Sequence, residues 1–306
     1  MSELAIEASG VRKAYGEFEA VRGIDIHVER GEIFAFLGPN GAGKTTTVEI
    51  LEGYRTRDGG DIAVLGVDPA SGGRAWRERI GIVLQECRME PVLTVRETLA
   101  LYAGYYATPR DVDETIDLVG LAESADVRAG RLSGGQQRRL DVALALIGDA
   151  ELLFLDEPTT GFDPSARRQA WDVIASLREL GKTVFLTTHF MDEAQYLADR
   201  VAIIRAGEIV ALGHPDELGG RADALTRISF ELPAGLDGST LPVPFARTNA
   251  GAIVEVDVAQ PVPVLNDLTT WALANGVELA GLKVNRPSLE DVYLELTEEL
   301  TGEQSP

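Results

Sequence analysis

Short apolar runs alternate with helical segments along the first two thirds of the chain. Ile24, Ile26 and Val28 alternate with polar residues, as in a strand with one buried face. Residues 33–37 (IFAFL) form a continuous apolar run, which is typical of a strand buried on both faces. Similar runs occur at residues 80–84, 152–155 and 183–186. Strands separated by helices predict an α/β fold with a largely parallel sheet.

Helical spacing dominates the block from about residue 88 to 148. Residues 94–106 and 111–119 carry apolar positions at helical intervals, and the sequence LSGGQ at 132–136 opens a further helix. Because strand-type runs lie on both sides of this block, we interpret it as a helical insertion within the sheet.

The pattern changes after Leu212. Residues 233–263 are rich in Pro and Gly, and strands are predicted at 226–232, 253–258 and 277–284. A helix is predicted over 264–275, ending at Gly276. A last helix, 287–300, places an apolar stripe on one face: Leu289, Val292, Tyr293, Leu296 and Leu300. We therefore expect two domains, residues 1–221 and a small α+β domain at 222–306.

Composition narrows the classes of function. The chain has 306 residues, of which 45% are hydrophobic, and a formal net charge of -21. A polyanion repels nucleic acid, so no nucleic-acid partner is expected. No apolar run reaches the length of a membrane-spanning helix, and no apolar signal core precedes the first strand, so we expect a cytoplasmic protein. Cys87 stands alone and forms no internal disulfide.

A glycine-rich segment follows the apolar run at 33–37. Gly38 to Thr45 fits the pattern G-x-x-x-x-G-K-[ST], with a strand before it and a helix after it. In such a loop backbone N–H groups surround phosphates, Lys44 adds positive charge, and the Thr45 hydroxyl can ligate Mg²⁺. An incidental glycine-rich turn would not be expected to have both neighbours in the right order.

The apolar strand at 152–155 ends in two acidic residues. Asp156 is placed to join a Mg²⁺ shell, and Glu157 to accept a proton from an attacking water. Apolar strands often end in acidic residues, so this pair indicates a nucleotide site only in combination with the phosphate loop. Together the two elements predict a P-loop ATPase.

Residues 132–136 make the prediction more specific. The sequence LSGGQ, followed by a helix, resembles the signature of the ABC ATPases. In that family the signature binds the γ-phosphate of the ATP held by the opposite protomer. Ser133 and the N–H groups of Gly134 and Gly135 lie at a helix N-terminus, which favours anions. A simple helix cap is the alternative interpretation of these residues.

Other ABC landmarks follow in family order. Tyr15 matches the aromatic residue that stacks on adenine, and Gln85 the glutamine loop that contacts Mg²⁺ and the attacking water. Asp163 lies in a loop that crosses the dimer interface, and His189 matches the switch histidine. The chain departs from the family at Phe162, where Leu is usual, and in the polar segment 86–88 after Gln85.

The resemblance covers about residues 3–218 and implies the complete site. It implies nucleotide contacts at Tyr15, Gly38, Pro39, Asn40, Gly41, Ala42, Gly43, Lys44, Thr45, Thr46, Ser133, Gly134, Gly135, Gln136 and Asp163. It implies Mg²⁺ ligands at Thr45, Gln85 and Asp156, and catalytic roles for Glu157, His189 and Gln85.

The family implies a fold, partners and a location. We expect an ABC ATPase with a mainly parallel core sheet, an N-terminal antiparallel β part and a helical insertion. It would bind ATP and Mg²⁺, form a homodimer, and power a separately encoded membrane permease at the cytoplasmic face of the membrane. Residues 286–294 (RPSLEDVYL) and 187–194 resemble drug-exporter ATPases of the daunorubicin-resistance type, which implies export of a drug-like or lipophilic compound.

Two other functions of nucleotide-binding proteins agree less well with the sequence than transport does. ABC ATPases of DNA repair carry long coiled coils and those of translation carry two ATPase modules, and the sequence shows neither feature. A nucleotide-binding regulator without turnover conflicts with the presence of both Glu157 and His189.

Overall fold

The chain folds as two units, Met1–Pro215 and Asp216–Pro306. The computed structural model describes residues 4–84, 90–218, 225–233, 236, 240–247, 253–285, 288–291 and 293. Within these residues, no helix combines the length and the apolar character needed to cross a membrane.

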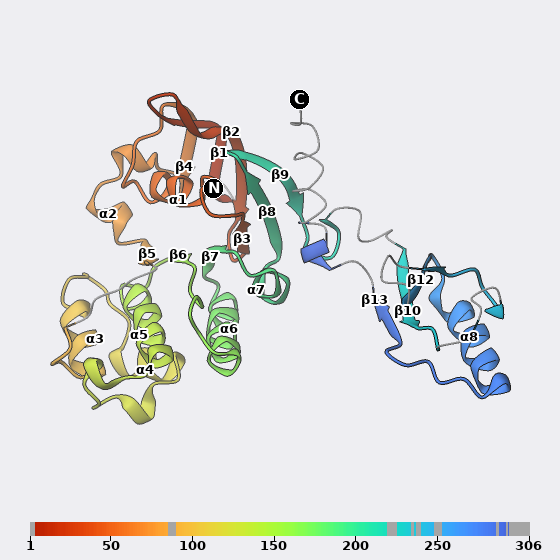
Figure 1. Ribbon diagram of the computed structural model, residues 1–306. Coiled ribbons are helices and arrows are strands. Elements are labelled where there is room, and N and C mark those ends of the chain that lie inside the picture. Colours follow the sequence, from red (N-terminus) through yellow and green to blue (C-terminus); the bar gives the residue numbers. More distant parts are fainter. Residues whose placement is uncertain are drawn as a thin grey trace. The chain divides into compact units, whose positions relative to one another are not determined.

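A six-stranded sheet forms the centre of the first unit (Figure 1). Its strands, in spatial order, are β5 (Ile80–Val83), β6 (Leu152–Asp156), β7 (Thr183–Thr188), β3 (Ile33–Leu37), β8 (Arg200–Arg205) and β9 (Glu208–Gly213). The first five run parallel, and β9 returns antiparallel to β8 as a hairpin. The predicted mainly parallel α/β fold is confirmed.

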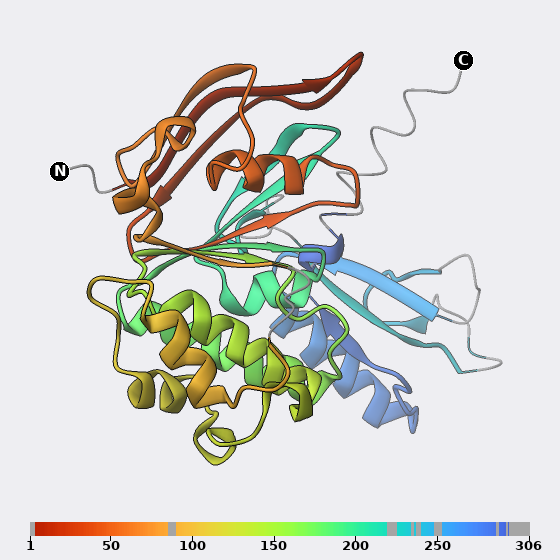
Figure 2. The ribbon, with the colours of Figure 1, turned by 90° about the vertical axis from the view of Figure 1, so that its left-hand side faces the viewer.

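A second, antiparallel sheet covers one face of the core sheet. It contains β2 (Phe18–Glu29), β1 (Leu4–Tyr15) and β4 (Gly59–Val64), in that order. Figure 2 shows helix α1 (Lys44–Leu51) between the two sheets. Phe185 is the centre of this layer, with ring centroids 5.5 Å from Phe34, 5.6 Å from Phe36 and 5.7 Å from Phe154. The expected N-terminal antiparallel part is therefore present.

Helices lie on the other side of the core sheet. Three of them contact its strands: α5 (Gly134–Leu146), α6 (Pro164–Glu179) and α7 (Met191–Leu197). Helices α3 (Val95–Ala103) and α4 (Val112–Leu118) pack on each other and on α5. Short helical turns complete the unit: η1 (Pro69–Ser71), α2 (Arg74–Arg77), η2 (Ala122–Ser124) and η3 (Ala129–Arg131). Leu153, Leu155 and Leu186 point from the sheet into this second core, because alternate residues of a strand face opposite sides.

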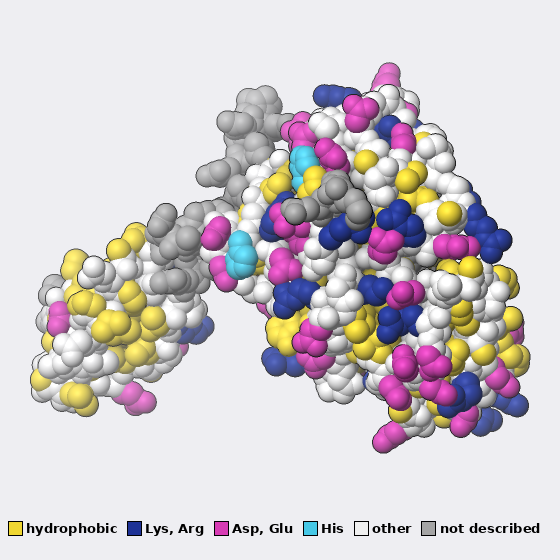
Figure 3. Space-filling model, turned by 180° about the vertical axis from the view of Figure 1, so that it is seen from behind, with side chains coloured by type: hydrophobic (Ala, Val, Ile, Leu, Met, Phe, Trp, Pro, Cys, Tyr) yellow, Lys and Arg dark blue, Asp and Glu magenta, His cyan; other side chains and the backbone are white. Residues whose placement is uncertain are grey.

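Among the described residues, the second unit contains a four-stranded antiparallel sheet and the helix α8 (Pro261–Asn275). The strands lie in the order β11 (Ala246–Arg247), β12 (Ile253–Val258), β10 (Thr226–Glu231) and β13 (Lys283–Asn285). Ile228, Phe230, Val254 and Leu268 form its buried core. Figure 3 shows further hydrophobic side chains gathered on one face of this unit.

Two predicted boundaries in this unit were wrong. The strand predicted at 277–284 is only β13, because Gly281 adopts a positive φ of 65° within a turn in which Leu282 N donates to Leu279 O. Helix α8 begins at Pro261, three residues before the predicted start, since proline fits the first turn of a helix.

The last predicted helix lies only partly within the described residues. Leu289 is buried, and Ser288 Oγ accepts a hydrogen bond from Asp291 N, as a helix cap does. Val292, Leu296 and Leu300 of the predicted stripe lie outside the described residues.

Candidate functional site

The glycine-rich loop joins β3 to α1. At two of its glycines a side chain would clash with neighbouring backbone atoms. A side chain at Gly43 would place Cβ 2.3 Å from Ala20 O, and one at Gly38 would place it 2.4 Å from Ile204 O. Gly43 also has a φ of 106°, which other residues avoid. The loop ends at the first turn of α1, where backbone N–H groups have no partner within the helix and attract anions.

Lys44 is a buried cation at the centre of the site. Its side chain is 7% exposed, its Nζ donates to Gly38 O at 2.6 Å, and Nζ lies 4.0 Å from Glu157 Oε1. Burial lowers the pKa of Lys44, while the charges of Glu157 and Asp156 raise it. The carboxylates thus help keep this ammonium group charged in a protein interior.

Asp156 and Glu157 stand at the carboxyl end of β6. Asp156 pairs with Thr187 of β7 in the sheet, and Thr187 Oγ1 donates to Asp156 Oδ1. Glu157 has a positive φ of 45°, and its N–H donates to Thr187 O at 3.1 Å. A non-glycine residue in this region carries backbone strain, which clusters at functional sites.

The two oxygens of Glu157 have different neighbours. Oε1 faces Lys44, whereas Oε2 lies 3.3 Å from His189 Nδ1 and accepts a hydrogen bond from Thr160 Oγ1 at 3.1 Å. Glu157 is 12% exposed and His189 40% exposed. A single carboxylate therefore links the buried cation to a more exposed imidazole.

These groups line one cavity of about 740 Å³. The predicted residues that line it are Tyr15, Pro39, Asn40, Gly41, Gly43, Lys44, Thr45, Thr46, Asp156, Glu157 and His189. Gly38 and Ala42 belong to the same loop but are not among its lining residues. The sequence interpretation missed Phe18, Ala20 and Thr160. Phe18 pairs with Tyr15 across the β1–β2 turn, and two aromatic residues flanking a two-residue turn were the available signal.

The remaining predicted residues lie elsewhere. Ser133–Gln136 and Asp163 are not among the residues that line the cavity, and Gln85 lies outside the described residues. Ser133 and Gln136 form a capping box on α5, with Ser133 N donating to Gln136 Oε1 at 2.9 Å. Asp163 caps α6, accepting from Ser165 N and Ala166 N. In a single chain these side chains thus serve as helix caps.

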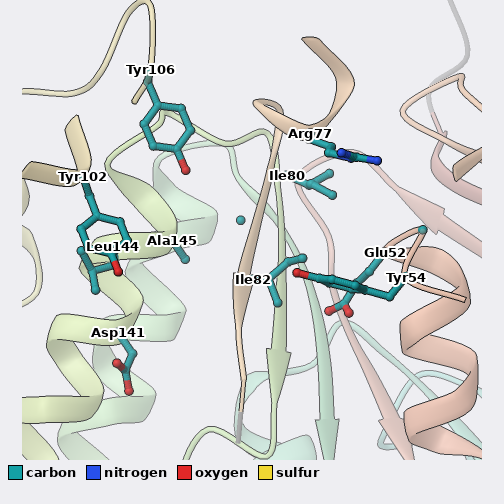
Figure 4. A pocket seen from close by; sticks show the side chains of 12 residues that line it. Glu52, Tyr54, Arg77, Ile80, Ile82, Tyr102, Tyr106, Asp141, Leu144 and Ala145 are labelled. Atoms are coloured by element: carbon teal, nitrogen blue, oxygen red, sulfur yellow. The ribbon is translucent and has the colours of Figure 1, made fainter. Parts of the chain in front are cut away.

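A second cavity, of about 490 Å³, lies between β5, α3, α5 and the end of α1. Figure 4 shows Tyr102 and Asp141 on its helical side, Glu52 and Tyr54 opposite, and Ile82 of β5 between them. Glu52 is buried. Burial, with smaller contributions from the nearby charges of Asp156 and Glu49, raises its pKa from 4.5 to about 8.

Comparison with known proteins identifies the family. A family described as "ABC transporter" matches residues 21–160, and an "ABC transporter domain-containing protein-like, C-terminal domain" matches residues 226–288. The daunorubicin resistance ATP-binding protein DrrA3 of Streptomyces coeruleorubidus is 36% identical over 308 residues, covering 97% of each chain. The chain belongs to the ATP-binding subunits of ABC transporters.

Other ABC proteins agree with this assignment. The Nod factor export ATP-binding protein I of Bradyrhizobium diazoefficiens is 44% identical over 71% of this chain and 73% of that protein. The solved ATP-binding cassette MJ0796 covers 68% of this chain and 98% of its own, with a TM-score of 0.60 and 24% identity, a likeness of fold. This ABC subunit is thus an ATPase whose hydrolysis of ATP is coupled to transport.

The raised pKa of Glu52 predicts a pH-dependent stability. Between about pH 4.5 and 8 the unfolded chain has Glu52 ionised while the folded protein keeps it protonated, so stability falls as pH rises through this window. Glu52→Gln should remove that decline and gain on the order of 1–3 kcal/mol over the parent at pH 8. Urea unfolding at pH 5 and pH 8 measures it, with Glu123→Gln at an exposed position as the control. Equal pH slopes for parent and Glu52→Gln would contradict the prediction.

Tyr15 lines the cavity and is 42% exposed, and we predict that its ring stacks on adenine. Tyr15→Ala should weaken ATP binding about tenfold, because stacking on a base contributes about 1–3 kcal/mol. It should leave the affinity for inorganic tripolyphosphate unchanged, since that ligand has no base. Calorimetry with both ligands measures this, and Phe18→Ala is the matched comparison. A larger loss in Phe18→Ala would assign the stacking to Phe18 instead.

Proposed function

We propose that two copies of this chain enclose two ATP molecules and that the dimer drives a separate membrane permease. The proposal rests on one observation: the predicted nucleotide contacts fall into two groups, and only one of them lines the cavity. Lys44, Asp156, Glu157 and His189 converge on one cavity, whereas Ser133–Gln136 do not line it. One chain therefore offers half of each site, and a second copy supplies the other half.

The N-terminus of α5 suits such a role. Ser133 and Gly134 are exposed, and a Cβ placed on Gly134 would have no heavy atom within 4 Å. The first N–H groups of a helix have no intrahelical partner and carry partial positive charge. An anionic phosphate held by another copy can approach these groups closely because no side chain stands in front of Gly134.

The residues around the cavity fit a magnesium–ATP complex. Mg²⁺ prefers oxygen ligands and usually takes only one or two from the protein, the rest coming from phosphates and water. Thr45 and Asp156 line the cavity and offer a hydroxyl and a carboxylate. Among the described residues, no group of three or more His, Cys, Asp or Glu side chains lies together as a metal site. When bound, Mg²⁺ would neutralise charge on the phosphates.

The chain's own groups divide the remaining work. Lys44, fixed at the phosphate loop, would stabilise negative charge on the transferred phosphoryl group. Glu157 would accept the proton of the attacking water, and its contacts with His189 and Thr160 hold the carboxylate in place. His189, more exposed than Glu157, would contact the γ-phosphate. Catalysis would thus rest mainly on positioning and charge.

Relatives support an exporter. The names of two of them refer to daunorubicin resistance and to Nod factor export. The solved structure of MJ0796 is described as a dimer bound to ADP and phosphate. By analogy we propose a homodimer at the cytoplasmic face of the membrane, attached through its permease, that exports a drug-like or lipophilic compound.

If Glu157 is the general base, a variant without this carboxylate should remain in the ATP-bound state. Glu157→Gln should bind ATP with unchanged affinity but lose turnover about 100-fold or more, because an amide cannot accept the proton. The variant should accumulate as an ATP-bound dimer in light scattering. Glu179→Gln, at an exposed position of α6, is the control. Turnover within a few-fold of the parent would show that another group acts as the base.

If the signature of one protomer binds the ATP of the other, a change in the signature should prevent dimer formation without preventing ATP binding. Gly134→Asp, in a Glu157→Gln background, places a carboxylate at the approach of the γ-phosphate. ATP should still bind the monomer, but the ATP-dependent dimer should not form. Gly73→Asp is the matched control, since Gly73 is the N-cap residue of a helix and also has open space around a Cβ. A normal ATP-dependent dimer in Gly134→Asp would refute the role of the signature.

A further inference from the structure

Arg138 is a buried cation outside the nucleotide cavity. It lies in α5, five residues after Ser133, and only 8% of its side chain is exposed. Its neighbour Arg139 is less buried and donates to Gly120 O at 2.8 Å, within the helical insertion. The two arginines are adjacent in sequence but contact different parts of the unit.

The guanidinium of Arg138 binds three backbone carbonyls. Nε donates to Pro158 O at 2.9 Å, Nη2 to Asp156 O at 2.8 Å, and Nη1 to Leu84 O. Nη1 also lies 3.6 Å from Asp141 Oδ2, which is on the same helix. Arginine is suited to this arrangement because its donors form a rigid planar fork.

The carbonyls of Leu84 and Asp156 lie where β5 and β6 stop pairing with each other. The pairing of β5 with β6 ends at Val83 and Leu155. Leu84 and Asp156 each come one residue later, so the ladder no longer joins them. Arg138 bridges the two strand ends at that point. In the sequence Leu84 directly precedes Gln85, and Asp156 and Pro158 flank Glu157.

We infer that Arg138 is a positioning residue that couples the signature helix to the carboxylates of its own chain. This inference rests on the proposed dimer. In that dimer the N-terminus of α5 serves the ATP bound by the partner, whereas Asp156 and Glu157 serve the ATP of their own chain. Arg138 connects the two through one rigid group, so a shift of α5 displaces the turn that carries Glu157.

Arg138→Lys tests the inference because it keeps the charge but has one nitrogen, which cannot hold three carbonyls in a plane. We expect kcat for ATP hydrolysis to fall on the order of 10–100-fold, as for a small misplacement of reacting groups. The KM and the affinity for ATP should stay within about threefold, because none of the three carbonyls belongs to the phosphate loop. Arg139→Lys should leave both parameters within about twofold of the parent.

A merely structural role gives a different result. It would lower the melting temperature but leave kcat per folded molecule unchanged, and that outcome would overturn the inference. If Arg138→Lys does not fold, Asp141→Asn removes only the carboxylate beside Nη1. It should lower kcat about threefold without changing KM, and an unchanged kcat there would also count against the inference.

Mixed dimers test the coupling itself. Lys44→Ala in one protomer leaves a single active site, built from the phosphate loop of the other protomer and the signature of the Lys44→Ala protomer. Arg138→Lys is then placed in either protomer. Coupling predicts that both placements lower turnover. A loss only when Arg138→Lys shares a chain with the active Glu157 would overturn it. If the unmodified dimer shows no ATP-dependent assembly or turnover, the proposed function itself has failed.

Discussion

The parallel pairing of β3, β7 and β6 is the constraint on which the site depends. Parallel strands end at the same edge of a sheet, and each of these three continues directly into a functional segment. Leu37 pairs with Thr188, and Asp156 pairs with Thr187. The phosphate loop, Glu157 and His189 are therefore brought to one edge by backbone hydrogen bonds, before any side chain contributes.

The charged residues at that edge are held in energetically unfavourable states. A buried ammonium group is stable only when paired, and Lys44 has both a backbone carbonyl and nearby carboxylates. Glu157 is held with a positive φ, which a relaxed chain would avoid. The contacts of Thr187 with Asp156 and with the Glu157 backbone help maintain this conformation. Thr187, to which the sequence assigned no role in the site, thus supports both carboxylates.

The sequence predicted the local elements better than the contacts between distant segments. The phosphate loop and the Asp156–Glu157 pair were predictable because each motif combines a strand end with fixed spacing. Phe18 and Thr187 were not, since their roles depend on pairing across a turn and across two strands. The role of Arg138 was not predicted, because no periodicity indicates which carbonyls a buried side chain reaches. The strand predicted at 277–284 was too long because the apolar residues of this segment lie on both sides of a turn at Gly281.

The N-cap position of α5, occupied by Ser133, must suit both the helix and an anion that approaches it. Helices α4 and α6 are capped by the carboxylates of Asp111 and Asp163, which only accept hydrogen bonds. Helix α5 is capped by Ser133, whose oxygen accepts from Gln136 N while its own hydrogen stays available to donate. An aspartate would cap this helix equally well but would present a negative charge to an arriving phosphate. A neutral hydroxyl is therefore the cap that stabilises the helix and still leaves its N-terminus open to an anion.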